Sequence, residues 1–174
     1  MSPLVRRTLA PRGETPILEV KGGGREKVSV IAGLSLSPVA HRLGLYFETY
    51  PNAYINNQGT ADFLRELLRH LRGKVIVVWD NGPVHKGEPI RRVLQNYPRL
   101  SVEWLPPYAP ELNPVEQLWN HIKYNELANF TTTDAWALDE DVTEVLIEAK
   151  LNQGRLGSFY AGTPLRLPDR TRIT

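Results

Sequence analysis

This sequence of 174 residues contains no cysteine. It therefore has no disulfide framework and no cysteine-ligated zinc or iron–sulfur site. No apolar run reaches the roughly 18 residues that a membrane-spanning helix needs, so we expect no membrane partner and no signal peptide. One-sided charge is lacking too: 21 basic and 19 acidic residues leave a net charge of +2, which by itself does not indicate a nucleic-acid partner.

The remaining composition is typical of one globular domain. Hydrophobic residues make up 41% and charged residues 23%, which excludes collagen-like and wholly disordered chains. The 13 glycines and 14 prolines predict many connections between elements. We assign residues 1–162 to a single domain and residues 163–174 to a C-terminal tail.

Hydrophobic periodicity predicts an alternation of strands and helices. We expect four strands, over residues 27–36, 42–50, 74–80 and 100–105, and weaker β signals at 7–10 and 16–20. Expected helices are one capped by Thr60 and ended by Gly73, and others over 89–96, from Asn113, and over 139–152 with Gly154 beyond its end. The continuous apolar run at 74–80 favours a strand buried on both faces. This order predicts an α/β domain with a mixed sheet.

Asp80 is the first candidate functional residue. It closes the apolar run and is followed by Asn81, Gly82, Pro83, Val84 and His85. Functional groups collect at the carboxyl ends of parallel strands, where a carboxylate can coordinate a divalent cation. The alternative is a plain turn, because Asn-Gly is a strong hairpin signal; the residues that follow do not resume a strand pattern.

Glu116 is the second candidate. Asn113 is placed as the N-cap of a helix, Pro114 as its first residue and Glu116 three residues after the cap. Taken alone, this spacing favours a capping box, in which the Glu116 carboxylate accepts from the backbone N–H of Asn113. Glu116 also lies at the edge of the apolar stripe formed by Val115, Leu118, Trp119 and Ile122, from which it can face a crevice beside the sheet.

Other chemistry-bearing residues show weaker patterns. The four histidines have no paired metal-ligand spacing, and no phosphate-binding glycine loop or Gly-x-Ser-x-Gly turn is present. We expect the four tryptophans, Trp79, Trp104, Trp119 and Trp136, in the core, and the Arg65, Arg69 and Arg72 face of the first helix in solvent.

Two long signatures resemble one family. Both resemble the catalytic domain of mariner-type DDE transposases. The first segment is Val-Ile-Val-Val-Trp-Asp80-Asn81-Gly-Pro-Val-His85, and the second is Leu-Pro-Pro-Tyr108-Ala-Pro-Glu-Leu-Asn113-Pro-Val-Glu116-Gln-Leu-Trp119. A spacing of 36 positions between Asp80 and Glu116 resembles the bacterial insertion-sequence branch. The upstream segment Val-Arg-Arg-Thr-Leu-Ala-Pro-Arg-Gly-Glu-Thr-Pro is also similar, so the resemblance covers roughly residues 3–150.

The resemblance implies a ribonuclease-H-like fold, a mixed sheet flanked by helices. In this family three acidic residues hold two divalent metals, Mg²⁺ or Mn²⁺, for phosphodiester hydrolysis and strand transfer in DNA transposition. By this resemblance Asp80 and Glu116 are the catalytic and metal-binding acids, and Asn81 and Asn113 shape the site. We expect DNA contacts from Arg6, Arg7, His85, Lys86, Arg91, Arg92 and Lys123. A bacterial, cytoplasmic and nucleoid-associated protein is expected.

The sequence departs from the family at the first acid. That acid normally ends an apolar strand upstream of Val5-Arg6-Arg7, and this chain has no such strand there. Asp62, Glu19 and Glu48 are unconvincing substitutes because they belong to other expected elements. We therefore expect a truncated, frameshifted or split transposase, whose missing upstream part would be encoded before Met1.

Three functions stay open at this stage. The chain is a transposase catalytic-domain fragment, an active nuclease that recruits another acid, or a non-catalytic remnant that binds DNA, another transposase copy or the upstream half of a split transposase. A remnant with no function stays open as well. Because the absent strand is central in the family's sheet, between those at 27–36 and 74–80, we expect a split or rearranged sheet or an open central slot. Unpaired strand edges also predict an unstable or aggregation-prone chain.

Overall fold

In a computed structural model, the structure describes residues 27–37, 40, 42–127 and 134–165. The strands are β1 (Val28–Ser37), β2 (Arg42–Pro51), β3 (Val75–Trp79) and β4 (Leu100–Trp104). The helices are α1 (Asn57–His70), α2 (Glu88–Asn96), α3 (Pro114–His121), α4 (Ala135–Leu151) and α5 (Gln153–Ala161), and α3 continues into a π-helical turn (Ile122–Glu126). Short 3₁₀ turns cover Pro83–His85 and Pro110–Leu112.

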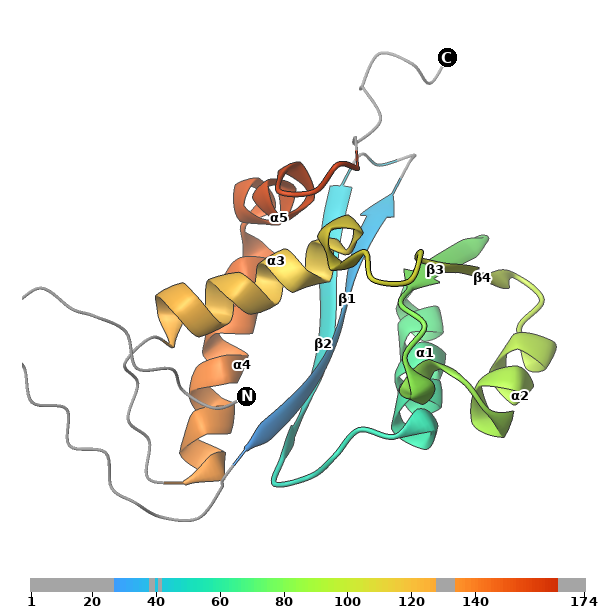
Figure 1. The fold of residues 1–174 in the computed structure, drawn as a ribbon, viewed down its shortest axis with the longest axis horizontal. Helices are drawn as coiled ribbons and strands as arrows, with labels where there is room; N and C mark the ends of the chain where they lie inside the picture. Colours follow the sequence, from blue (N-terminus) through green and yellow to red (C-terminus); the bar gives the residue numbers. More distant parts are fainter. Residues whose placement is uncertain (1–26, 38–39, 41, 128–133, 166–174) are drawn as a thin grey trace, which may run out of the picture.

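The described strands form two separate sheets. β1 pairs antiparallel with β2, and β3 pairs parallel with β4. Figure 1 shows β1 and β3 as the inner strands, facing each other across the middle of the molecule. Among the described residues no strand joins them, so the expectation of a split sheet is confirmed.

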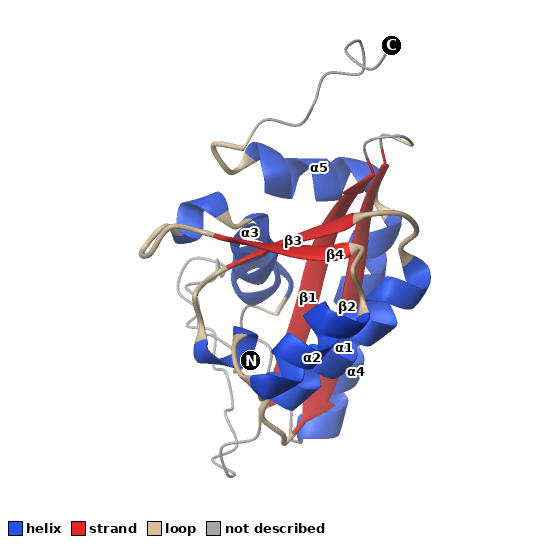
Figure 2. Ribbon diagram, turned by 90° about the vertical axis from the view of Figure 1, so that its right-hand side faces the viewer, coloured by secondary structure: helices blue, strands red, loops and turns tan. Residues whose placement is uncertain are grey.

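The apolar core is divided in the same way. One cluster joins β1 and β2 to α3, α4 and α5, and its fully buried members include Leu45, Leu118 and Leu146. The other joins β3 and β4 to α1 and α2 around Leu64 and Val93. Figure 2 shows the second sheet and its two helices in front of the first sheet. Each half therefore buries its own apolar side chains.

Two tertiary findings correct the sequence-based expectations for β3 and the tryptophans. β3 is buried on one face only, because Ile76 is 66% exposed and Val78 55% exposed while Trp79 is buried. Both strands of this sheet contact α1 and α2 on a single side. Trp104 and Trp136 are also exposed rather than in the core, because they lie on faces that no other described element covers.

The helix ends differ from those expected from sequence. α1 starts three residues before Thr60, because the Asn56 side chain accepts the Gly59 N–H at 3.0 Å, and it ends at the cap Leu71 rather than at Gly73. α4 begins at Ala135, capped by Asp134, instead of at 139.

Helix α5 was missed altogether. Asn152 ends α4 and its side chain also caps the next helix, accepting the Arg155 N–H at 2.9 Å, so Gly154 lies inside α5. None of the helices in the described part of the chain is long and apolar enough to span a membrane.

Candidate active site

A large cavity lies between the two sheets. Its volume is about 1650 Å³, and residues from β1, β3 and α1 line it, whereas no residue of β4 does. Five residues from three different segments line this cavity: Asp80, His85, Asn113, Glu116 and Lys123. The structure therefore brings together five of the residues that the sequence had singled out.

Asp80 stands directly after β3, where the chain turns into the 3₁₀ turn. Its Oδ1 accepts the Gly82 N–H at 2.8 Å and lies 3.3 Å from His85 Nε2. The Asp80 side chain is 61% exposed, so much of the carboxylate is open to the cavity. The residues after Asn81 and Gly82 form this turn and then α2, which confirms that no hairpin follows β3.

His85 is held between Trp79 and Asp80. Its ring stacks on Trp79 with centroids 4.5 Å apart, and only 20% of its side chain is exposed. Burial lowers the pKa of His85, and the neighbouring Asp80 carboxylate partly opposes that shift. A neutral imidazole with its proton on Nε2 would donate to Asp80, so the geometry suits His85 to orienting this carboxylate.

Gly82 is a site residue that the sequence reasoning did not single out. A Cβ at this position would lie 2.8 Å from Asp80 Oδ1 and 3.4 Å from His85 Cδ2. A side chain at position 82 would therefore push the Asp80 carboxylate out of its present position. In the sequence, the Asn81-Gly82 pair indicates only a turn, and nothing local predicts this contact.

Glu116 is not part of a capping box. The Asn113 N–H donates to the Pro110 carbonyl at 3.0 Å, while the Asn113 side chain accepts the Val115 N–H at 3.1 Å. Asn113 is thus the N-cap, as expected, but its N–H is not available to Glu116. Within the described part of the chain, the Glu116 carboxylate has no hydrogen-bond or ion-pair partner, and it lines the cavity.

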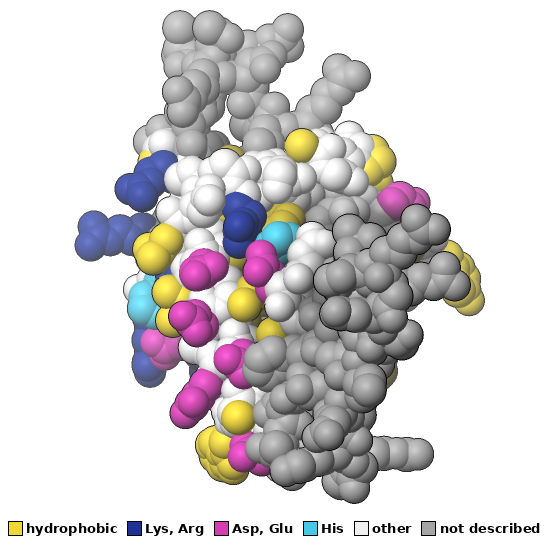
Figure 3. Space-filling model, turned by 90° about the vertical axis from the view of Figure 1, so that its left-hand side faces the viewer, with side chains coloured by type: hydrophobic (Ala, Val, Ile, Leu, Met, Phe, Trp, Pro, Cys, Tyr) yellow, Lys and Arg dark blue, Asp and Glu magenta, His cyan; other side chains and the backbone are white. Residues whose placement is uncertain are grey.

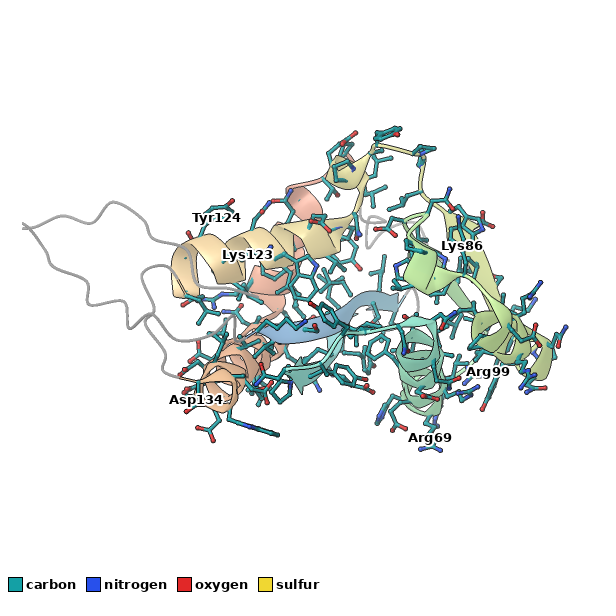
Figure 4. The ribbon with its side chains drawn as sticks, turned by 60° about the horizontal axis from the view of Figure 1, so that its bottom comes forward. Arg69, Lys86, Arg99, Lys123, Tyr124 and Asp134 are labelled. Carbon is teal, nitrogen blue, oxygen red and sulfur yellow. The ribbon has the colours of Figure 1, made fainter. Side chains whose placement is uncertain are left out.

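The expected DNA-contact residues are scattered. Lys123 lines the cavity, whereas Lys86 Nζ lies 5.8 Å from the centre of the Trp104 ring. Figure 4 shows these two lysines on opposite halves of the molecule. Arg91 and Arg92 both pair with Glu88 on α2, at 3.2 and 3.0 Å. Asn81 is exposed outside the cavity lining, and Arg6 and Arg7 lie outside the described residues.

Other acidic residues do not complete the site. Asp62 pairs with Arg65 on α1, and Glu48 accepts the Tyr50 hydroxyl. Neither lines the cavity, and Glu19 lies outside the described residues. Over the described residues no group of three or more His, Cys, Asp or Glu side chains is placed to hold a metal ion. Asp80 and Glu116 offer the oxygen ligands that Mg²⁺ and Mn²⁺ prefer, but they form only part of such a site.

Acidic side chains are concentrated on α4 and its surroundings. Figure 3 shows acidic side chains gathered there. α4 carries five acidic residues and only one basic residue, Lys150.

Comparisons with known proteins show the family of the chain and its fold. The family model of the DDE superfamily endonucleases matches residues 2–138, and the chain belongs to this family. No curated protein sequence matches the chain. The fold is similar to the Mos1 transposase paired-end complex with left transposon end (TM-score 0.63, 19% identity, 93% of this chain and 48% of that one).

Two further structures show the same likeness. They are the Mos1 mariner paired end complex with Mn, at a TM-score of 0.61 and 17% identity, and the Mos1 strand transfer complex, at 0.57 and 19%. The two matches cover 93% and 92% of this chain, and 47% and 46% of the respective Mos1 chains. The ribonuclease-H-like α/β fold expected from sequence is confirmed, and the chain spans about half the length of these transposases.

Proposed function

We propose that this chain is the catalytic portion of a DDE transposase, in which Asp80 and Glu116 are two of the acids that hold divalent metal. The observation that carries the proposal is their convergence. Asp80 at the end of β3 and Glu116 in the first turn of α3 are 36 positions apart and line the same cavity. The Glu116 carboxylate has no protein partner in the described structure, and the Asp80 carboxylate is largely exposed, so both are available to a cation.

Mg²⁺ or Mn²⁺ bound by these acids would supply Lewis-acid stabilisation of a phosphodiester displacement. One related structure is a Mos1 complex with Mn, which supports a divalent metal here. The chain's own residues act around the metal: His85 orients the Asp80 carboxylate, and Asn113 fixes the start of the helix that carries Glu116. Hydrogen-bonded partners of metal ligands of this kind typically change metal affinity 10–100-fold.

DNA is the proposed substrate and partner. Lys123 lines the same cavity as the acids, so we assign it a contact with a phosphate near the reacting bond. Contacts with DNA farther from the acids would come from Lys86, Arg91, Arg92, Arg6 and Arg7. The bacterial insertion-sequence branch rests on the spacing of the two acids and stays a prediction. A location on the bacterial nucleoid rests on the family resemblance and also stays a prediction.

A second function is favoured by one specific observation. The described residues provide two acids but no third, so a chain that binds DNA or a transposase partner without cutting is the alternative. In that case we expect salt-dependent DNA binding with no cleavage by the purified chain in Mg²⁺.

DNA binding by the full chain tests the proposal. We expect Lys123→Ala to weaken binding to duplex DNA and to reduce the salt slope of log K by about 0.9. Arg69→Ala is the matched control, because Arg69 pairs with Glu66 on α1 and does not line the cavity. Equal effects of the two substitutions, or no binding at low salt, would contradict a DNA site at the cavity.

A further inference from the structure

The outer face of α4 carries large apolar side chains that no described element covers. Trp136, Ile147 and Leu151 are each at least 46% exposed, whereas the inner face of the helix packs on β1, β2 and α5. At about 100° per residue, Ile147 lies about 20° around the helix from Trp136, and Leu151 about 60°. The three side chains therefore share one face, and Trp136 and Ile147 are about 16 Å apart along the helix axis. Exposed apolar side chains gathered on one face mark an interaction site.

Acidic side chains separate these apolar ones. Glu140 and Glu144 are exposed and lie between Trp136 and Ile147 along the axis, about 40° and 80° around the helix from Trp136. Figure 3 shows hydrophobic and acidic side chains next to one another on this side of the molecule. Within the described residues no ion pair neutralises Glu140 or Glu144. A partner that covers this face therefore has to supply positive charge, because burying an unpaired carboxylate is unfavourable.

The charge of α4 disfavours a second copy of the same face as the partner. The helix has five acidic residues and one basic residue, Lys150, whose Nζ lies 6.0 Å from the centre of the Tyr46 ring on β2. Two such faces would bring like charges together, whereas a basic segment would gain from the same charges.

The apolar side chains favour a helix over an extended segment. An extended segment would place backbone N–H and C=O groups against Trp136, Ile147 and Leu151 without hydrogen-bond partners, while a helix pairs its own backbone groups. Packed helices interdigitate side chains at three- and four-residue spacing, which is the spacing of the exposed residues on α4.

We infer that the outer face of α4 is a docking site for a basic amphipathic helix of a separate protein. Apolar residues of that helix contact Trp136 at one end of the face and Ile147 and Leu151 at the other. Its Lys or Arg residues pair with Glu140 and Glu144 in between. The inference goes beyond the proposed function, because no residue of α4 lines the cavity that holds Asp80 and Glu116.

The test measures binding of a designed peptide to the full chain by fluorescence anisotropy. The peptide is a labelled helix of about 18 residues, or five turns, with leucines at both ends of one face and lysines between them. A second peptide has the same composition, but its leucines and lysines are redistributed around the helix. The two peptides therefore carry the same charge, and only the first has an apolar and basic face.

Matched double substitutions locate the binding face. Trp136→Ala with Glu140→Gln removes one apolar and one acidic side chain from the outer face of α4. Trp104→Ala with Glu103→Gln is the control, because it removes an exposed tryptophan and an exposed glutamate from β4. All four side chains are exposed, so the circular dichroism of both variants should match that of the parent chain. Leu151→Gln is a second, single substitution at the other end of the face.

We expect the first peptide to bind saturably, with a Kd at least about tenfold lower than that of the redistributed peptide. The α4 double substitution should raise this Kd at least about tenfold, and the β4 control should change it less than about twofold. Leu151→Gln should also raise the Kd. Equal affinity for the two peptides would overturn the inference, because charge attraction alone would explain the binding. Equal effects of the α4 and β4 substitutions would overturn it too.

Sedimentation velocity of the chain without peptide tests the second copy as the occupant. We expect no self-association through α4. A dimer that the α4 double substitution abolishes would assign this face to a second copy and contradict a separate partner. Metal and DNA binding at Asp80, Glu116 and Lys123 are measured separately, so failure of this inference leaves the proposed function standing, and the reverse also holds.

Discussion

His85 Nε2 lies 3.3 Å from Asp80 Oδ1, while the same histidine ring stacks on Trp79 at the end of β3. The contact links the carboxylate to a largely buried ring, so the position of Asp80 depends on the packing of Trp79 and His85. The Gly82 N–H, 2.8 Å from the same Oδ1, adds a second constraint. Asp80 is thus oriented by contacts within its own turn.

Gly82→Ala should displace Asp80 with little loss of stability. The new Cβ would meet Oδ1 at 2.8 Å, and this exposed carboxylate can rotate away. We expect the free energy of unfolding to change by less than about 0.5 kcal/mol. Because Asp80 raises the pKa of His85 against the effect of burial, the variant should have a lower His85 pKa than the parent chain.

An NMR titration of His85 measures this change, with Asp80→Asn as the control that should lower the pKa in the same direction. If the His85 pKa stayed the same in Gly82→Ala, the proposed crowding at Oδ1 would be wrong.

Glu116→Gln should leave the stability of the domain nearly unchanged. The carboxylate has no partner in the described structure, so we expect a change within about 0.5 kcal/mol in urea unfolding. Asn113→Ala is the comparison, because it removes the cap on the Val115 N–H and should cost about 0.5–2 kcal/mol. Equal destabilisation by both substitutions would assign Glu116 to the helix cap after all.

The double substitution Ile76→Thr and Val78→Thr should reduce aggregation of the purified chain. Both side chains are more than half exposed, and exposed apolar strand edges are sites of association. Light scattering and binding of an apolar dye measure the change. Leu64→Ala is the control for a buried position, 2% exposed, and should destabilise by about 2–5 kcal/mol. Unchanged scattering in the double variant would show that other surfaces drive association.

The stability of the chain should fall at high pH, in part through Tyr160. Burial raises the pKa of Tyr160 to about 12 from the ordinary 10.0. Between these values the unfolded chain loses the phenol proton while the folded chain keeps it, so the free energy of unfolding decreases as pH rises from about 10 to 12.

Tyr160→Phe has no proton to lose, so its free energy of unfolding should decrease less over this range than that of the parent chain. Urea unfolding at pH 8, 10 and 11 measures the difference, with pH 8 as the reference. Parallel profiles for the two proteins would contradict the assigned burial. Tyr50, whose pKa burial and Glu48 also raise to about 12, remains in the variant and keeps part of the slope.

The sequence by itself determined the four strands to within one or two residues, because apolar alternation and β-branched runs are local properties. It also indicated Asp80, Glu116 and the N-cap Asn113, because two long motifs and an Asn-Pro pair carry that information in a few adjacent positions.

Only the tertiary structure decided which of these residues meet and which strand faces are covered. Asn152 ends one helix and caps the next, a dual role that no periodicity reveals. Ile76 and Val78 are apolar yet exposed, because burial depends on whether another element covers their face. Likewise, Glu116 does not take its expected capping role, because the Asn113 N–H donates a hydrogen bond to the Pro110 carbonyl instead. Glu116 and Asp80 line the same cavity because that cavity lies between the two sheets.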